Sequence, residues 1–322
     1  MGAPGLARLC GGLALGFGLS LGAAWAQTPL PAPKPGTTAA APAKPETRAA
    51  EIKTDLNKPA RDLFGHVKGP APLATRSIGF YSKGCLAGGV ALPVNGPTWQ
   101  AMRLSRNRNW GHPELVDYIE AFAAEVPKVS GWKGILVGDM AQPRGGPMLT
   151  GHASHQLGLD VDVWLTPNPG RELTRAEREK MSALDMVRKD RLDVDPATWR
   201  PDTWKVIRLA ASDPRVERVL VNAAIKKALC REATGNRSWL AKVRPYWGHD
   251  HHMHIRLACP KDSPQCRHQA PVSGAEECGA DLAWWFSDEV LHPKPSKTPS
   301  KPRHQITLGE LPSACAEVLV AQ

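Results

Sequence analysis

The sequence lacks a long apolar run. No segment approaches the ~20 consecutive apolar residues that span a bilayer, so we expect no integral membrane association. Near the N-terminus, Arg8 precedes a short run rich in glycine, alanine and leucine (9–21), and Ala24-Trp25-Ala26 provides an A-x-A cleavage site. This layout is typical of a cleaved secretory signal peptide over residues 1–26. We therefore expect an exported, periplasmic protein.

Two common hydrolase motifs are also missing. The chain has no H-E-x-x-H, which excludes the zinc peptidases built on that helical motif, and no G-x-S-x-G nucleophile turn. Ser130-Gly131-Trp132-Lys133 matches the S-x-x-K pattern of penicillin-binding enzymes, but no K-T-G follows it. The sequence therefore disfavours serine chemistry.

Cysteine is scarce, and its count becomes even once the signal peptide is removed. The chain has 7 cysteines, of which Cys10 lies within residues 1–26. An even number in an exported chain predicts three disulfide bonds but leaves their pairing open. The six remaining cysteines are Cys85, Cys230, Cys259, Cys266, Cys278 and Cys315.

The chain is basic, with a formal net charge of +10. A basic surface attracts polyanions without specifying a fold. For an exported protein, the anionic cell wall is a more fitting partner than nucleic acid. The oligomeric state cannot be read from the sequence.

Proline-rich composition marks two stretches of the chain. Residues 27–60 are dominated by proline, alanine, lysine and threonine, which predicts an extended tether rather than a core. Residues 292–303 have a similar composition. We expect the rest of 61–322 to form one domain, to which a disulfide at Cys315 ties the tail beyond the second stretch.

Helical and strand patterns alternate irregularly inside this domain. Helices are expected from Pro113 to just before Pro127, from the capping box at Thr174 to about Lys189, over 203–211, and from the cap at Asn222 to about residue 230. Strands are expected at 134–138 and 216–221. Because the pattern lacks a regular βαβ rhythm, it predicts an α+β fold. We expect a small antiparallel sheet flanked by helices and long loops and stapled by disulfides.

Histidine is concentrated in two segments. Residues 151–162 read Gly-His-Ala-Ser-His-Gln-Leu-Gly-Leu-Asp-Val-Asp, and residues 247–257 contain four histidines. Imidazole and carboxylate are ligands that zinc prefers, and a catalytic zinc uses three of them. A single histidine is usually structural, but both clusters also show strand alternation, over residues 160–164 and 252–257. Two adjacent strands could therefore present Asp162 and His254 to one metal. His155 would arrive from the preceding loop, where Gly158 allows a tight turn.

These motifs resemble those of a known family. The spacing from His155 to Asp162, followed far downstream by His252-x-His254, is similar to the zinc peptidase group of lysostaphin-type enzymes and D-alanyl-D-alanine peptidases. The longer strings, together with Tyr-Ser-x-Gly-Cys at 81–85 and Val-Arg-Pro at 243–245, resemble the penicillin-insensitive murein endopeptidases. The resemblance covers about residues 75–320.

The resemblance implies specific roles for the clustered residues. His155, Asp162 and His254 would bind Zn²⁺, with His152 beside them as a further ligand, and His252 and His249 would be the catalytic histidines. It also implies the disulfides Cys85–Cys315, Cys230–Cys278 and Cys259–Cys266. Relatives may hold an accessory metal near 189–193, but this chain has only Asp190 and Asp193 there and no histidine.

The implied activity is zinc-dependent hydrolysis of D-alanyl–meso-diaminopimelyl cross-links in peptidoglycan, insensitive to penicillin. A D,D-carboxypeptidase or an L,D-specific endopeptidase would carry nearly the same ligands. A non-catalytic, zinc-containing wall-binding protein is the alternative from another class. We expect the loop 141–150, which precedes the first ligands, to contribute to specificity.

Overall fold

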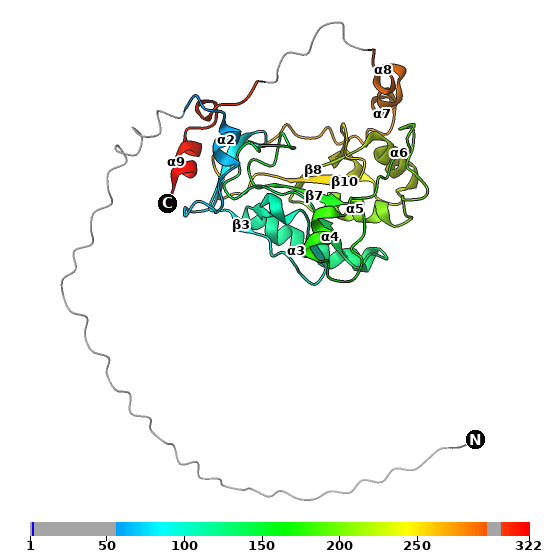
Figure 1. Ribbon diagram of the computed structural model, residues 1–322. Coiled ribbons are helices and arrows are strands. Elements are labelled where there is room, and N and C mark those ends of the chain that lie inside the picture. The colour runs from blue at the N-terminus through cyan, green and yellow to red at the C-terminus, as the bar shows by residue number, and fades with distance from the viewer. Residues whose placement is uncertain (1, 3–55, 295–303) are drawn as a thin grey trace, which may run out of the picture. The chain divides into compact units, whose positions relative to one another are not determined.

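The computed structural model describes residue 2, residues 56–294 and residues 304–322 (Figure 1). The predicted signal peptide, apart from Gly2, and most of both proline-rich stretches lie outside the described residues. Within the described part, no helix is long and apolar enough to cross a membrane.

A six-stranded sheet in the order β4-β6-β7-β10-β8-β9 forms the centre of the fold. Its inner strands pair antiparallel, whereas β4–β6 and β8–β9 are parallel pairs at the two edges. The predicted α+β class is confirmed, with a sheet that is mixed rather than wholly antiparallel. Parallel neighbours need a crossover, and a helix supplies it in both cases: α3 between β4 and β6, and α6 between β8 and β9. The strands of this sheet are β4 (Trp99–Ala101), β6 (Ile135–Val137), β7 (Asp160–Trp164), β8 (Val216–Val221), β9 (Val243–Pro245) and β10 (His252–Leu257).

Helices α3 (Pro113–Val129) and α5 (Thr203–Ser212) share the main hydrophobic core with the inner strands and lie on the same side of the sheet in Figure 1. The ring of His112 caps α3 by accepting a hydrogen bond from the backbone of Glu114. The prediction that Pro127 ends this helix is wrong, because the helix continues to Val129. A proline in the last turn removes only one helical hydrogen bond, and the buried Val126 holds that turn against the core.

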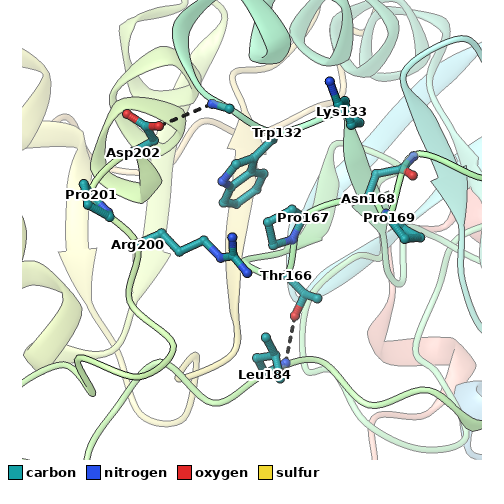
Figure 2. Close-up of a pocket in the computed structure, with 11 residues that line it drawn as sticks. Trp132, Lys133, Thr166, Pro167, Asn168, Pro169, Leu184, Arg200, Pro201 and Asp202 are labelled. Carbon is teal, nitrogen blue, oxygen red and sulfur yellow. Dashed lines mark hydrogen bonds between the residues drawn. The ribbon is translucent and has the colours of Figure 1, made fainter.

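Helix α4 (Arg175–Lys180) has the predicted capping box but ends at Lys180 rather than near Lys189. Long-range hydrogen bonds take over the backbone beyond that point. The Leu184 N–H donates to the hydroxyl of Thr166 (Figure 2), and the Met186 N–H donates to the carbonyl of Asp250. These bonds hold the chain that follows α4 in an irregular conformation beside the start of β10.

The other predicted elements agree with the structure. Helix α6 (Ala223–Glu232) begins at the predicted cap, where the side chain of Asn222 accepts from the Ala224 N–H. The remaining helices and strands are α2 (Ala60–Phe64), β1 (Arg76–Phe80), β2 (Lys83–Ala87), β3 (Val90–Ala91), η2 (Leu104–Arg106), β5 (Trp110–Gly111), η3 (Ser238–Lys242), α7 (Ala280–Ala283), η4 (Trp284–Phe286), α8 (Asp288–Leu291), η5 (Leu308–Glu310) and α9 (Ala314–Val320).

A smaller hydrophobic cluster joins the segment 56–64 to the segment that starts at residue 306. Helices α2 and α9 lie side by side (Figure 1) and pack with β1 and β2. The Ala60 N–H donates to the carbonyl of Ile306, and a disulfide joins Cys85 to Cys315. The other disulfides are Cys230–Cys278 and Cys259–Cys266, so the pairing is the one that the resemblance implies.

Candidate metal centre

The pairing of β7 with β10 brings the two histidine-rich segments together. The strands are antiparallel, with Asp162 directly opposite His254 and Asp160 opposite Arg256. Because alternate residues of a strand share a face, all four polar side chains lie on one side of the sheet. Val161, Val163, Met253 and Ile255 fill the core on the other side.

The loop before β7 turns sharply to bring His155 beside Asp162. His155 has a φ of 64° and Gly158 a φ of 71°, and both values are in the left-handed region. At Gly158 a Cβ would lie 2.6 Å from the Leu86 side chain and 2.9 Å from the backbone nitrogen of His112, so only glycine fits there. Asp160 accepts a hydrogen bond from the His155 N–H, which fixes the strained residue. Strain of this kind is common at functional sites.

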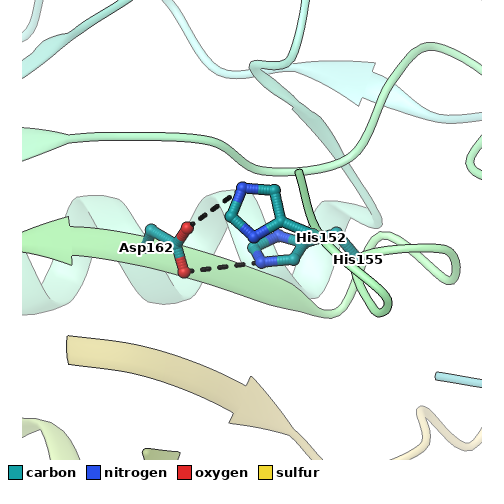
Figure 3. A group of neighbouring side chains, drawn as sticks. All are labelled: His152, His155 and Asp162. Atoms are coloured by element: carbon teal, nitrogen blue, oxygen red, sulfur yellow. Dashed lines mark ion pairs between the residues drawn. The ribbon is translucent and has the colours of Figure 1, made fainter. Parts of the chain in front are cut away.

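Asp162 is the centre of the cluster, surrounded by four imidazoles. Its Oδ1 lies 3.2 Å from His254 Nδ1, 3.4 Å from His155 Nε2 and 3.7 Å from His252 Nε2. Its Oδ2 lies 3.4 Å from His152 Nε2. Figure 3 shows Asp162 facing His152 and His155, and the ligand atoms of these three residues all lie within 4.8 Å of one another.

Burial and the nearby imidazoles set the protonation of this cluster. Burial alone would raise the pKa of Asp162, but the neighbouring His252 and His155 lower it well below its usual value. Burial lowers the pKa of His155. Asp162 is therefore a carboxylate and His155 a neutral imidazole at neutral pH, the forms in which both residues bind metals.

Asp160 orients the ring of His254 from behind. Its Oδ1 accepts from His254 Nε2 at 2.7 Å and from Arg256 Nε at 2.6 Å, and the carboxylate is fully buried. This bond leaves His254 Nδ1 facing Asp162. Against the effect of burial, Asp160 raises the pKa of His254 to about 8. A carboxylate behind a histidine is a recurring arrangement at metal sites, where it fixes the tautomer and the ring orientation.

The two predicted catalytic histidines lie at the edge of the cluster. Burial lowers the pKa of His252 to about 4, so the ring is neutral at pH 7. His249 has a φ of 55° and shares a hydrogen bond of 2.8 Å between Nδ1 and the carbonyl of Trp247. In the neutral ring, that bond places the proton on Nδ1 and leaves the Nε2 lone pair free.

The donor set fits a bound cation. Both ring nitrogens of His155 and the Oδ1 of Asp162 are buried and lack a hydrogen-bond partner of good geometry within the described residues. Each such atom costs about 1–3 kcal/mol unless something satisfies it. A divalent ion held by imidazole and carboxylate would satisfy them. The donor atoms of His152, His155 and Asp162 lie together, and His254 contacts the same carboxylate.

Several residues near the cluster were not anticipated from the sequence. Asp139, just after β6, accepts hydrogen bonds from Arg106 and Arg108 and contacts His152 Nε2 at 3.0 Å. Although burial opposes the shift, His152 and the two arginines lower the pKa of Asp139 to about 2. The sequence signal that could have identified Asp139 is its position directly after the predicted buried strand at 134–138.

The region suggested for an accessory metal has a different arrangement. Asp190 pairs with Arg188, and Asp193 pairs with Arg231 and Lys227. Both carboxylates therefore already have cationic partners within the chain.

Two clefts flank the cluster. The first, about 360 Å³ and here called the acidic cleft, includes Asp139, Asp162, Asp185 and Asp250. The second, about 590 Å³ and here called the arginine cleft, includes Arg218, Arg244 and Arg256 with His249 and His254.

The loop 141–150 lines neither cleft within the described chain, contrary to the expected role in specificity. It is mostly buried and is held against β2 by the Leu86 N–H, which donates to the carbonyl of Arg144. The described residues that line a separate hollow around Trp132 and Arg200 (Figure 2) include no histidine and none of the predicted site residues.

The buried carboxylate of Asp162 on β7 meets imidazoles from β10 and from the loop before β7, and this arrangement forms a candidate metal centre. Residues 77–320 match the family model of the penicillin-insensitive murein endopeptidases. The chain therefore belongs to this peptidase family.

Curated relatives agree with that assignment. The penicillin-insensitive murein endopeptidase of Klebsiella pneumoniae is 43% identical over 246 residues, covering 76% of this chain and 86% of the relative. The Haemophilus influenzae protein of the same name is 42% identical over 242 residues, covering 75% and 82%. That of Escherichia coli O1:K1 is 42% identical over 250 residues, covering 78% and 88%.

Proposed function

We propose that this chain is a zinc-dependent endopeptidase that hydrolyses D-alanyl–meso-diaminopimelyl cross-links in peptidoglycan. The observation that carries the proposal is the buried Asp162 carboxylate, which meets four imidazoles and keeps one oxygen without a hydrogen bond. Family membership supplies the substrate class, because the relatives are named murein endopeptidases.

His155, Asp162 and His254 would hold the zinc ion, with His152 beside them as a further ligand. When bound, zinc polarises the scissile carbonyl and lowers the pKa of a coordinated water to about 7. The chain keeps this set in place through Asp160, which holds the His254 ring and the backbone of His155. Asp139 similarly restrains the His152 ring from the outer side.

His252 would act as the general base. Its ring is neutral at pH 7 and lies 3.7 Å from the Asp162 carboxylate, so it can accept the proton of the attacking water. His249, once protonated, would stabilise the negative charge that develops on the carbonyl oxygen. The two histidines could exchange these roles, since neutral His249 lines the arginine cleft and its Nε2 keeps a free lone pair when Nδ1 donates to Trp247.

Peptidoglycan is the proposed partner, and the periplasm is the proposed location. The signal-peptide pattern of residues 1–26 and the three disulfides both fit an oxidising compartment outside the cytoplasm. The net charge of +10 favours attraction to an anionic wall.

Digestion of purified cross-linked muropeptide dimers, followed by mass analysis, tests the bond that is cut. We expect conversion of dimers to monomers with zinc present, no conversion with a chelator, and no effect of penicillin. Loss of a terminal D-alanine from intact dimers would instead indicate a D,D-carboxypeptidase. Intact dimers that bind the protein without any product would favour the non-catalytic wall-binding alternative.

A further inference from the structure

Three arginines lie side by side on the floor of the arginine cleft. Arg256 is on β10, Arg218 faces it across the strand pair on β8, and Arg244 is on β9 opposite Leu220. All three line the same cleft as His249 and His254. Three adjacent guanidinium groups repel one another unless each has a counter-charge, so their partners show which of them is available to a ligand.

Two of the three arginines are already neutralised within the chain. Arg256 donates to Asp160 at 2.6 Å and to the side-chain oxygen of Gln269 at 3.0 Å, and its guanidinium stacks on the Tyr81 ring at 3.6 Å. Arg244 forms an ion pair with Glu277. Both side chains are therefore fixed parts of the cleft wall.

Arg218 differs from its two neighbours. Its side chain is buried, with a residue exposure of 7%, yet it forms no ion pair with a carboxylate among the described residues. Its two hydrogen bonds go to the backbone carbonyls of Glu217 and Ala270. A guanidinium has five N–H donors, so Arg218 keeps donors that no described residue uses, while Glu217 and Glu277 act on its charge from beyond ion-pair distance. Burial lowers the pKa of Arg218; the nearby Arg244 and Arg256 add to this effect, whereas Glu217 and Glu277 oppose it.

The sheet register places Arg218 close to the candidate metal centre. Arg218 is two residues before Leu220, and Leu220 lies opposite His254. Diagonal neighbours on one face of an antiparallel pair are roughly 7–8 Å apart. A group held by Arg218 would therefore be within a few bonds of an atom held near His254.

We propose that Arg218 binds the free carboxylate of the residue whose amino group supplies the nitrogen of the scissile amide. This inference rests on the proposed function. An amide formed on the α-amino group of an amino acid carries a carboxylate on the next carbon, and a guanidinium binds a carboxylate with two parallel hydrogen bonds. Arg218 is then the residue that selects cross-links bearing this free carboxylate.

The charges of the two clefts favour binding of this carboxylate in the arginine cleft. The acidic cleft has four carboxylates, Asp139, Asp162, Asp185 and Asp250, against Arg103 and Arg106. The arginine cleft has three arginines against one carboxylate, Glu277. An anionic group next to the amide is therefore attracted to the arginine cleft and repelled from the other one.

The test compares two synthetic cross-linked peptide dimers that differ only in this group, a free carboxylate in one and a carboxamide in the other. We expect the wild-type protein to cleave the carboxylate dimer with a kcat/KM about 10- to 100-fold higher. Arg218→Gln should lose about the same factor on the carboxylate dimer and remain near the wild type on the carboxamide dimer. Arg218→Lys should keep part of the preference, because it keeps the charge but not the paired hydrogen bonds.

Arg208→Gln is the control, since Arg208 is a partly exposed arginine on α5 that lines neither cleft. Equal cleavage of both dimers by the wild type would overturn the inference, as would an Arg218→Gln variant that loses the same factor on both. If Arg218→Gln does not fold, the wild-type comparison alone decides. Failure of the zinc-loaded wild type to cleave either dimer would instead overturn the proposed function.

Discussion

Replacing Asp160 with asparagine should weaken both the fold and the metal site. The substitution keeps the size of the side chain but removes the charge that faces Arg256 Nε at 2.6 Å and His254 Nε2 at 2.7 Å. Removing one partner of a buried ion pair costs about 3–5 kcal/mol. Asp160 is fully buried, so solvent cannot replace the lost charge, and we expect a loss of stability in this range.

The same substitution should lower zinc affinity by about 10- to 100-fold, the usual effect of losing a residue that orients a ligand. The loss arises because asparagine no longer holds the His254 ring with Nδ1 toward Asp162. Denaturant unfolding of the metal-free protein measures the stability, and competition with a chromophoric chelator measures the affinity. The two readouts separate a general loss of stability from a loss of ligand orientation.

Asp213→Asn is a matched control for this experiment. It breaks the partly exposed ion pair between Asp213 and Arg215, which is 2.8 Å long and contains none of the site residues. We expect it to cost at most about 1 kcal/mol and to leave zinc affinity unchanged. An Asp160→Asn variant with the stability and zinc affinity of the wild type would refute the role assigned to Asp160.

Three further predictions concern separate parts of the chain. His254→Ala should lose zinc and activity together, whereas His252→Ala should lose activity but retain most of the metal. Metal analysis and dimer digestion check both variants. Loss of zinc from His252→Ala would make that residue a ligand. Burial lowers the pKa of Lys226 from 10.5 to about 8. Between these two pKa values the folded protein holds a neutral Lys226 and the unfolded chain a protonated one, so unfolding takes up a proton. The free energy of unfolding should therefore rise with pH by about 3 kcal/mol over this range. Chemical denaturation from pH 7.5 to 10.5 should show this rise in the wild type and not in Lys226→Met. Replacing Cys85 and Cys315 together with serine should lower the free energy of unfolding by about 2–5 kcal/mol, and an unchanged denaturation midpoint would contradict this.

The local elements were largely predictable from the sequence. The alternation of residues 160–164 and 252–257 predicted two strands with their polar side chains on one face, and the register pairs Asp162 with His254 as that idea requires. Helix caps at Thr174 and Asn222 were also readable, because a capping side chain acts within its own turn.

Features set by long-range contacts were not predictable. Helix α4 ends at Lys180 because the chain beyond it bonds to Thr166 and Asp250, and nothing in the local sequence encodes those partners. The parallel edge pairs were missed for a similar reason, since the strands β4 and β9 have only three residues each. Short strands give little alternation to read.

The candidate site was predictable in its residue types but not in its supporting contacts. Histidine clustering identified the imidazoles around Asp162, whereas the contacts of Asp139 and Arg218 emerged only from the packing. Their significance depends on which charges lie nearby, namely Arg106 and Arg108 for Asp139 and the absence of a described ion-pair partner for Arg218. Such relationships arise when distant segments fold together.

Zinc titration of metal-free protein tests the central claim most directly. The protein would be stripped with a chelator and dialysed, and cleavage of a cross-linked muropeptide dimer would then be followed as zinc is added back. We predict no cleavage without metal and a rate that rises to a plateau at one zinc ion per chain. Cleavage of the cross-link at the full rate by the metal-free protein would contradict the account.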